Sequence, residues 1–520
     1  MSRGRCGSQA FFKDLPALCI LIGTALWLRL HDSCSKYLDI DEAIELFVAG
    51  RPSFAEIFRM IRESFPQQYP VNYLLHHLIL RFTHDIQAAR CFPIILGAAS
   101  VALSYTLGAR LHSRKLGWLW SCLLCFSVYH IQYSQTLRLY SLVLFLFALH
   151  LSCSIRALRT GSLPWSYTAT AVLFQLAYPF AFAAVAVESA FLWFSQPERR
   201  SRTALTALLV LSIPAAWLAS LGRTLFLGPM FTYGPKAVFG APELWSVLFQ
   251  FGQHDRATAL VYAALFLIGF AACWRDRMTR GLTAALGGIL LALLLATMLS
   301  LWRAHLFLDP RHLIAVHLLY LGFIAAGMLA LLSLTPLSRV PTPVALVLAT
   351  AFIVQRAAGP LADYAAFNRP MQQALLRSAA FLRREIGPRD VIIASNPNFG
   401  ATFIYYYDPA SFFRLKDVSL AWGLNFFVFP KDLKAFSGRY WNAAYTLNPL
   451  APGSATMDRE GFSRLLSRTE TSGGRLWFVH LPVNYLTGDR PFYSLLRGVP
   501  WRLQSAAPGV YSLMGRESLK

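Results

Sequence analysis

Residues Gly281–Leu301 read GLTAALGGILLALLLATMLSL, an uncharged apolar run that reaches the roughly 20 residues needed to cross a lipid bilayer as an α-helix. Other apolar blocks in the chain approach the same length, and they include Leu15–Leu30, Phe92–Leu111, Thr203–Leu221 and His312–Leu334. Because several such blocks occur in one chain, the sequence predicts an integral membrane protein with many transmembrane helices. The same pattern excludes a soluble globular domain.

The composition agrees with this prediction. Of the 520 residues, 56% are hydrophobic and only 14% are charged, whereas a soluble domain carries roughly 25% charged residues. The formal net charge is +22, a balance that a nucleic-acid-binding protein could also show. Here, however, Arg and Lys lie in short loops between apolar blocks, where basic residues fix the orientation of a membrane protein. The charge therefore indicates a lipid bilayer as the partner and no nucleic acid.

The basic loops also predict a topology. Arg3, Arg5 and Lys13 precede the first apolar block, so we expect a cytoplasmic N-terminus with that block retained as a helix. Basic clusters at Arg156/Arg159, Arg199/Arg200/Arg202 and Arg275/Arg277/Arg280 mark further cytoplasmic loops, which leaves Gly222–Arg256 as an outer loop. The remaining apolar blocks are Val71–Phe82, Leu116–Tyr133, Leu139–Ile155, Trp165–Phe180, Ala181–Phe194, Thr258–Trp274 and Val344–Val354.

The apolar blocks and the loop charges disagree on the number of membrane crossings. Twelve blocks would return the C-terminus to the cytoplasm, but the loop charges place the chain beyond Arg356 outside, which requires an odd number. We therefore expect about 11–13 transmembrane helices. The division is ambiguous at Val71–Phe82 and between Phe92 and Ile155.

Two polar regions accompany the helices. In the outer loop 31–70, Asp41–Ala49 and Phe54–Glu63 place apolar residues at helical spacing, which predicts two amphipathic helices at the membrane surface. From about Leu361 the composition changes. Met371–Glu385 predicts an amphipathic helix ended by Gly387-Pro388, while Asp390–Ser395 and Arg475–Leu481 predict strands. We thus expect a transmembrane domain over residues 1–360 and a soluble extracytoplasmic α/β domain over 361–520.

Cysteine and histidine give little support to metal or redox chemistry. Cys122 and Cys125 form a C-x-x-C inside an apolar block, where packing between helices is the simpler interpretation. His76 and His77 are adjacent, so on a helix their side chains point about 100° apart and cannot hold one ion together.

Three carboxylates lie just beyond the first membrane helix, in Asp39-Ile40-Asp41-Glu42. One interpretation is structural, because Asp39 could cap the helix that begins near Asp41, and carboxylates suit the positive end of a helix. The other is a general base or a metal-binding acid at the membrane–water boundary. The residues alone leave both open.

Two arginines accompany apolar helices in a similar way. Arg138 lies in Tyr133-Ser134-Gln135-Thr136-Leu137-Arg138-Leu139-Tyr140, between two long apolar blocks. A guanidinium there either snorkels to lipid headgroups or binds phosphate oxygens in a bidentate fork. Asp309-Pro310-Arg311-His312 begins a late helix, and it predicts either a proline-initiated helix start or a second phosphate or acceptor contact.

The order of these motifs resembles that of a known family. After the Asp41-Glu42 pair come Tyr69-Pro70-Val71-Asn72-Tyr73, Arg90-Cys91-Phe92-Pro93, the Y-S-Q-x-x-R-x-Y pattern of Tyr133–Tyr140, and Arg311-His312-Leu313-Ile314. Together they resemble the GT-C membrane glycosyltransferases related to protein O-mannosyltransferases and to the lipid A aminoarabinose transferase. The resemblance covers about Leu15–Leu334 and, more loosely, the C-terminal domain. The chain departs from the pattern at Val71-Asn72, at Gln67-Gln68, where an acid is expected, and at His312, which replaces a common tyrosine.

The resemblance implies a transfer reaction. A hexosyl or pentosyl group would move from a polyprenyl-phosphate carrier to a hydroxyl of a glycan, lipid or protein on the extracytoplasmic face, with inversion. Asp41 would act as the base, with Glu42 as the reserve, and Arg138 and Arg311 would bind the donor phosphate. Asp39, Tyr69, Tyr133, Tyr140 and His312 would contact substrate. A divalent metal is a possible cofactor, with Asp39 and Asp41 as candidate ligands, and the expected location is a bacterial inner membrane.

Two other classes remain open from the sequence. A transporter or lipid flippase would share the helices and the arginine, but it would not need an acidic outer loop or a large outer domain, and it often has repeated halves. The altered Pro70-Val71-Asn72 stretch also leaves room for an inactive scaffold subunit of GT-C type.

Overall fold

The computed structural model describes residues 6–64, 69–160, 164–195, 197–221, 241–276, 279–303, 310–334, 340–394, 402–403, 405–409, 412, 425–430, 445–446, 467, 469, 471–479, 501–507 and 510–515. The chain divides into two compact units. The first unit consists of Met1–Cys34 and Ile61–Tyr364, and the second of Ser35–Met60 and Ala365–Lys520.

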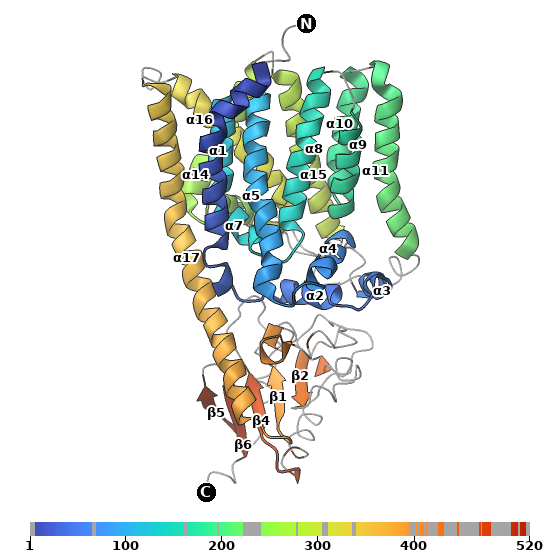
Figure 1. Ribbon diagram of the computed structural model, residues 1–520, viewed down its shortest axis with the longest axis vertical. Helices are drawn as coiled ribbons and strands as arrows, with labels where there is room; N and C mark the ends of the chain where they lie inside the picture. The colour runs from blue at the N-terminus through green and yellow to red at the C-terminus, as the bar shows by residue number, and fades with distance from the viewer. Residues whose placement is uncertain are drawn as a thin grey trace. The chain divides into compact units, whose positions relative to one another are not determined.

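The first unit is an array of helices lying side by side (Figure 1). Its helices are α1 (Cys6–Leu30), α4 (Val71–Leu80), α5 (Ile86–Leu111), α6 (Arg114–Cys125), α7 (Val128–Ser134), α8 (Tyr140–Thr160), α9 (Trp165–Ala177), α10 (Ala181–Ser195), α11 (Arg200–Leu221), α13 (Ala241–Phe251), α14 (Arg256–Arg275), α15 (Arg280–Arg303) and α16 (Ile314–Leu334). Short 3₁₀ turns occur at η1 (Ser33–Ser35), η2 (Pro197–Arg199) and η3 (Pro310–Leu313).

Seven of the described helices are long and apolar enough to cross a membrane, in agreement with a multi-pass membrane protein. They are α1, α5, α8, α14, α15, α16 and α17 (Thr342–Glu385). The shorter helices α9 and α10 and the helix α11 lie alongside them in Figure 1. The ambiguous blocks are where the helices are irregular. The block at Val71–Phe82 forms only the ten-residue α4, about 15 Å long against a hydrocarbon core of about 30 Å.

The block Leu116–Tyr133 is divided between α6 and α7. The break falls at Phe126 and Ser127, and the Ser127 hydroxyl accepts a hydrogen bond from the His130 N–H at 3.2 Å as the cap of α7. Cys122 and Cys125 lie buried in α6, where Cys122 packs against Thr350 and Cys125 against the Leu21 carbonyl. This C-x-x-C thus packs between helices.

Glycines allow two of the long helices to approach closely. A Cβ added to Gly269 of α14 would lie 1.9 Å from the Phe323 carbonyl oxygen of α16, and one added to Gly327 would lie 2.0 Å from the Leu265 oxygen. Both distances are too short for any side chain. Small residues at such crossings let two backbones meet inside a membrane, where packing rather than water exclusion drives helix association.

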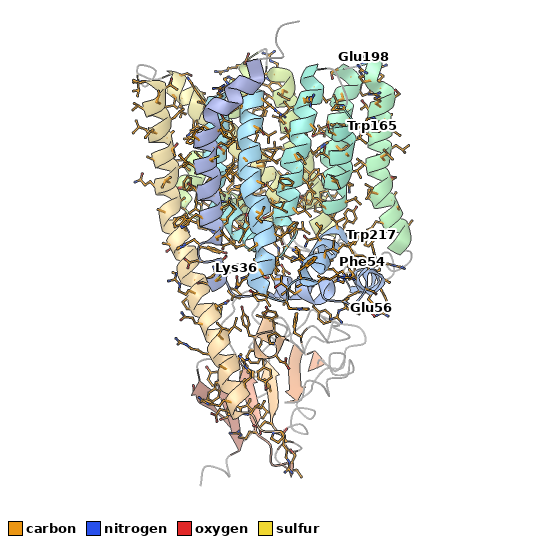
Figure 2. The ribbon with its side chains drawn as sticks, viewed as in Figure 1. Lys36, Phe54, Glu56, Trp165, Glu198 and Trp217 are labelled. Atoms are coloured by element: carbon orange, nitrogen blue, oxygen red, sulfur yellow. The ribbon has the colours of Figure 1, made fainter. Side chains whose placement is uncertain are left out.

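The two ends of the array differ in composition. Arg156 near the end of α8, Arg199, Arg200 and Arg202 between α10 and α11, and Arg275 and Arg280 between α14 and α15 lie at one end of their helices. Figure 2 shows Glu198 near this end of α11 and Trp217 near the other. Tyr140, which begins α8, and Tyr178, which follows α9, lie at the ends of their helices opposite to the arginines. The motif residues are thus separated from the basic loops.

The second unit contains the predicted amphipathic helices and a mixed sheet. Helix α2 (Ile40–Ala49) and helix α3 (Phe54–Ser64) match the predicted ranges, although α3 extends past the boundary of the unit at Met60. The predicted Met371–Glu385 helix is the end of the 44-residue α17, which also passes from one unit into the other.

The sheet has the strand order β3-β2-β1-β4-β6-β5, in which β1 and β4 are parallel and the other neighbours antiparallel. The strands are β1 (Val391–Ala394), β2 (Asn425–Pro430), β3 (Tyr445–Thr446), β4 (Leu476–Val479), β5 (Trp501–Ala507) and β6 (Val510–Gly515). The strands expected at Asp390–Ser395 and Arg475–Leu481 are confirmed as β1 and β4. All four residues of β4 are buried.

Candidate functional site

The acidic cluster begins helix α2 in the second unit. The Asp39 carboxylate accepts a hydrogen bond from the Glu42 N–H at 2.8 Å, and the Glu42 carboxylate accepts one from the Asp39 N–H at 3.4 Å. This reciprocal arrangement is a capping box, which satisfies backbone donors that the first helical turn cannot. The prediction that Asp39 caps this helix is therefore confirmed.

Glu42 also pairs with a buried lysine. The Lys36 Nζ atom lies 2.7 Å from Glu42 Oε2 and 3.6 Å from Asp39 Oδ2. Glu42 has no exposed surface and Lys36 is 5% exposed. A buried carboxylate needs such partners, because desolvation of an unpaired charge is costly. The contacts of Glu42 thus serve the fold of α2.

Asp39 and Asp41 are more open to solvent than Glu42, and both are half-buried. Burial raises the pKa of Asp39 above its ordinary value, the Lys36 ammonium opposes this shift, and the neighbouring carboxylates of Glu42 and Asp41 add to it. Across the described part of the chain, no group of three or more His, Cys, Asp or Glu side chains is placed to hold a metal ion. Asp39 is already used as a helix cap, so these residues offer no assembled metal site.

Aromatic residues of the second unit hold the acidic helix in place. The Tyr406 hydroxyl accepts a hydrogen bond from the Leu38 N–H at 2.8 Å and donates one to Gln372 Oε1 at 2.9 Å, which links the start of α2 to α17. At the other end of α2, the rings of Phe47 and Phe412 pack edge to face. The aromatic run Tyr405–Tyr407 therefore supports the acids through packing and backbone contacts.

In the first unit, the Tyr133–Tyr140 motif forms the end of α7, a short turn and the start of α8. Gln135 fixes the turn. Its Nε2 donates to the carbonyl oxygens of Arg29 and His31 at 2.9 and 3.1 Å, and its Oε1 accepts from the Tyr364 hydroxyl at 3.0 Å. A single buried glutamine thus joins α1, α17 and the turn that carries Arg138.

Arg138 lies in this turn and is only 8% exposed. Beside the turn, the ring of Tyr133 packs edge to face against Tyr129 and Tyr140, with both centroid distances 4.8 Å. The guanidinium is therefore largely withdrawn from bulk solvent at the end of a membrane helix. An anion can bind it strongly there, because the local dielectric is low.

The second arginine motif is held next to the first. The Tyr129 hydroxyl donates to the Pro310 carbonyl oxygen at 2.5 Å, and the Tyr178 hydroxyl donates to the His312 carbonyl oxygen at 2.7 Å. Arg311 and His312 are half-buried in η3. Two segments that are far apart in the sequence, Tyr133–Tyr140 and Pro310–Leu313, thus meet through Tyr129. Asp309, the first residue of the predicted motif, lies outside the described residues.

Tyr69 belongs to the same end of the helical array. Its hydroxyl accepts a hydrogen bond from Gln175 Nε2 at 3.3 Å, and its ring packs edge to face against Trp217. Burial raises the pKa of the Tyr69 phenol above its ordinary value, so it remains a neutral hydrogen-bonding group. The neighbouring departure at Gln67-Gln68 lies outside the described residues.

Two buried polar groups were missed in the sequence because each lies singly in an apolar helix. Arg29 is fully buried and donates to the carbonyl oxygens of Leu124 and Cys125 at the end of α6, with His130 Nδ1 2.7 Å away. His150 of α8 lies 2.7 Å from the Glu188 carboxylate of α10. An ionisable residue inside a transmembrane block is the signal that points to such groups.

The structure thus brings Tyr69, Tyr133, Arg138, Tyr140, Arg311 and His312 into the first unit, and it places Asp39, Asp41 and Glu42 in the second. Within the first unit, Tyr129 joins the two arginine motifs, because its ring packs against Tyr133 and its hydroxyl donates to the Pro310 carbonyl oxygen. Such a surface can bind a phosphate and present polar aromatic groups around it. Within the second unit, the half-buried Asp41 carboxylate lies in the first turn of α2, and a carboxylate can accept a proton.

Comparisons with known proteins bear on the fold. No protein-family model matches the sequence, and no curated protein matches it. Among solved structures, ArnT from Cupriavidus metallidurans bound to undecaprenyl phosphate is similar, with a TM-score of 0.59 at 12% identity over 96% of this chain and 98% of that one. The apo form of ArnT gives a TM-score of 0.57 at 11% identity over the same shares.

An oligosaccharyltransferase from Archaeoglobus fulgidus is a further match, at 13% identity and a TM-score of 0.45 over 76% of this chain and 59% of that one. The likeness to ArnT extends over nearly the whole of both chains, at an identity that bears on architecture alone. The chain therefore shares the fold of the ArnT structures, in agreement with the fold that its motifs predicted.

Proposed function

Starting from the GT-C fold, we propose that this protein is a glycosyltransferase that moves one hexosyl or pentosyl group from a polyprenyl-phosphate carrier to an acceptor hydroxyl. The ArnT structure bound to undecaprenyl phosphate supports the class of carrier. The acceptor would be a glycan, a lipid or a protein.

One observation carries the proposal. Arg138 is largely buried in a turn at the end of a membrane helix, and the tyrosine beside this turn is linked by ring packing and a hydrogen bond to the segment that carries Arg311. A guanidinium can bind two phosphate oxygens in a planar bidentate fork. A lipid phosphate that arrives from the bilayer, with its tail still in hydrocarbon, is an anion that can reach such a position.

The reaction assigns a separate task to each motif. The acceptor oxygen attacks the anomeric carbon and forms the new glycosidic bond, while the bond from that carbon to the carrier phosphate breaks. The phosphate leaves with the electron pair, and Arg138 and Arg311 stabilise its growing negative charge. The Asp41 carboxylate takes the proton from the acceptor hydroxyl. A single displacement of this kind inverts the anomeric centre.

Asp41 is favoured over Glu42 as the base, because Glu42 is fully buried against Lys36 whereas Asp41 is half-buried and within reach of solvent. Asp39 is assigned to helix capping and substrate contact, and Tyr69, Tyr133, Tyr140 and His312 to substrate contacts.

The proposal also includes a location. The basic helix ends are assigned to the cytoplasm, so the motif residues, the acidic helix and residues 361–520 are assigned to the extracytoplasmic face. Nucleotide sugars are cytoplasmic, and a sugar carried on a polyprenyl phosphate is a donor available on this outer face. A bacterial inner membrane fits this arrangement.

The test uses the full chain in lipid nanodiscs. Binding of undecaprenyl phosphate is measured first, and transfer is then measured with a set of undecaprenyl-phosphate sugars and with lipids extracted from the source membrane as acceptors. Saturable binding of the carrier, followed by transfer of one sugar to an acceptor, is the expected result. A protein that binds neither the carrier nor any of the carrier-linked sugars would overturn the proposal.

A further inference from the structure

Helix α7 carries two of the tyrosines of the candidate site and has only seven residues, Val128–Ser134. A helix this short is not stable in isolation, because the nucleation cost is not recovered over so few hydrogen bonds. Its position must therefore come from its neighbours. At its C-terminal end, Gln135 makes the buried contacts with Arg29, His31 and Tyr364.

A second buried glutamine holds the N-terminal end. The Oε1 atom of Gln253 accepts a hydrogen bond from the Val128 N–H at 2.8 Å, and Gln253 is only 1% exposed. The first backbone N–H groups of a helix have no partner within the helix. Gln253 supplies one of these partners from a turn 125 positions away in the sequence.

The backbone of that turn is strained. Gln253 and His254 have φ values of 64° and 58°, in the left-handed region, and neither is glycine. Glycine adopts this conformation without steric cost, whereas other residues keep it only where the surrounding structure enforces it. Such outliers gather at functional sites, so the presence of a glutamine at this position requires an explanation.

The surrounding structure does fix the turn on both sides. A Cβ on Gly252 would lie 2.3 Å from the Ala259 Cα atom, so Gly252 is pressed against the first turn of α14. Asp255 caps α14 by accepting from the Thr258 N–H at 2.9 Å, and it also pairs with Arg356 at 2.6 Å. Between these points the chain must reverse within two residues. The Gln253 side chain is thereby directed onto the start of α7.

We propose that Gln253 is a positioning residue for the two segments assigned to phosphate binding, Tyr133–Tyr140 and Pro310–Leu313. It fixes the N-terminus of α7, and α7 then holds Tyr129 against the Pro310 carbonyl oxygen and Tyr133 against Tyr140. Tyr133 belongs to the motif that carries Arg138, and Tyr129 contacts the segment that carries Arg311. This inference rests on the proposed function, because its kinetic test measures the rate of glycosyl transfer.

Three variants separate the effect of the hydrogen bond between Val128 and Gln253 from the effect of the strained backbone at Gln253 and His254. Gln253→Gly removes both, and Gln253→Met removes the acceptor but keeps the volume and the strain. His254→Gly removes strain at the exposed neighbouring residue, together with its ring contact to Phe249, and leaves the hydrogen bond to Val128 in place. In the full chain, both Gln253 variants should lose about 10²-fold in kcat, the usual scale for a misplaced catalytic geometry. The KM for the donor should change little, and His254→Gly should retain the kcat of the parent.

Amide hydrogen exchange provides a readout that does not need activity. Exchange at Val128–Ser134 should accelerate in both Gln253 variants and stay unchanged in His254→Gly. Unchanged exchange at α7 in the two Gln253 variants, or an equal loss of kcat in His254→Gly, would overturn the inference. A parent protein with neither carrier binding nor transfer would instead refute the proposed function, and the exchange experiment would still decide the role of Gln253.

Discussion

The Lys36 ammonium lies 2.7 Å from the Glu42 carboxylate, with both side chains buried at the start of α2. Only six positions separate them, and the pair lies directly beside Asp41, which is half-buried. A buried ion pair next to a half-buried carboxylate divides the acidic cluster into a structural part and a part that solvent can reach. This division leads to the first prediction.

Asp41→Asn should abolish transfer while the protein still folds. Loss of a general base costs roughly 10²–10⁴-fold in rate, and Asn keeps the size of the side chain. Glu42→Gln is the matched comparison. It removes the nearer of the two carboxylates that pair with the buried Lys36 ammonium, so we expect the free energy of unfolding to fall by about 3 kcal/mol. Initial rates and melting curves of both variants are the measurements. Near-normal turnover in Asp41→Asn would exclude Asp41 as the base.

Arg138→Ala should lose most of the turnover, and Arg138→Lys should retain part of it. Lysine keeps the charge but lacks the planar fork that binds two phosphate oxygens. Because the phosphate gains negative charge as the glycosidic bond breaks, the loss should fall mainly on kcat. Donor binding and single-turnover rates in nanodiscs separate the two effects. If both variants bind donor and turn over like the parent, Arg138 is an anchor to lipid headgroups.

Single cysteines placed at Ser53 and Ser472 should react with a membrane-impermeant thiol reagent added from the extracytoplasmic side. Both positions lie in segments that the distribution of Arg and Lys assigns to the outside. The parent for this experiment lacks the exposed cysteines at positions 19, 34 and 91. Labelling of either site only after the cytoplasmic face is opened would place the acidic helix or the C-terminal segment on the wrong side for the proposed donor.

Asp390 lies beside the sheet of the second unit, where it contacts Arg475 and Trp477, and it should make the free energy of unfolding depend on pH. Burial alone would raise the pKa of its carboxyl, but hydrogen bonds from the Gly387 N–H, Trp477 Nε1 and Arg475 outweigh this effect, and the pKa is lowered. A lowered pKa contributes stability that is present above the unfolded value of about 3.9 and lost as pH falls through the folded value.

Asp390→Asn should therefore lower stability by about 2 kcal/mol at pH 7, and the difference from the parent should shrink below about pH 4. Thermal unfolding of the two proteins over this pH range is the measurement. Arg389→Ala is a control on the same turn, since its contact with the Ser472 carbonyl oxygen is exposed. A constant difference at all pH values would show that the Asp390 charge is not what stabilises the turn.

The sequence predicted individual helices where one physical preference dominates. Uncharged runs such as Gly281–Leu301 form membrane helices because each backbone polar group must be satisfied inside the segment. The sequence left the helix boundaries ambiguous where several physical preferences compete. The Leu116–Tyr133 block is apolar throughout, yet it breaks at Phe126 and Ser127, since Ser127 caps α7 and Gln253 accepts from Val128. That second contact comes from a distant part of the chain, and no local pattern reveals it.

The sequence by itself determined the membrane class and the order of the motifs, and it offered capping by Asp39 as one of two interpretations, because each depends on neighbours within a few positions. Only the tertiary structure decided that Glu42 is buried against Lys36, that Tyr129 joins the two arginine motifs, and that α7 is held by a glutamine at each end. Contacts across 125 or 181 positions depend on how helices pack. Composition sets how much apolar surface a helix carries, and packing decides which polar groups meet.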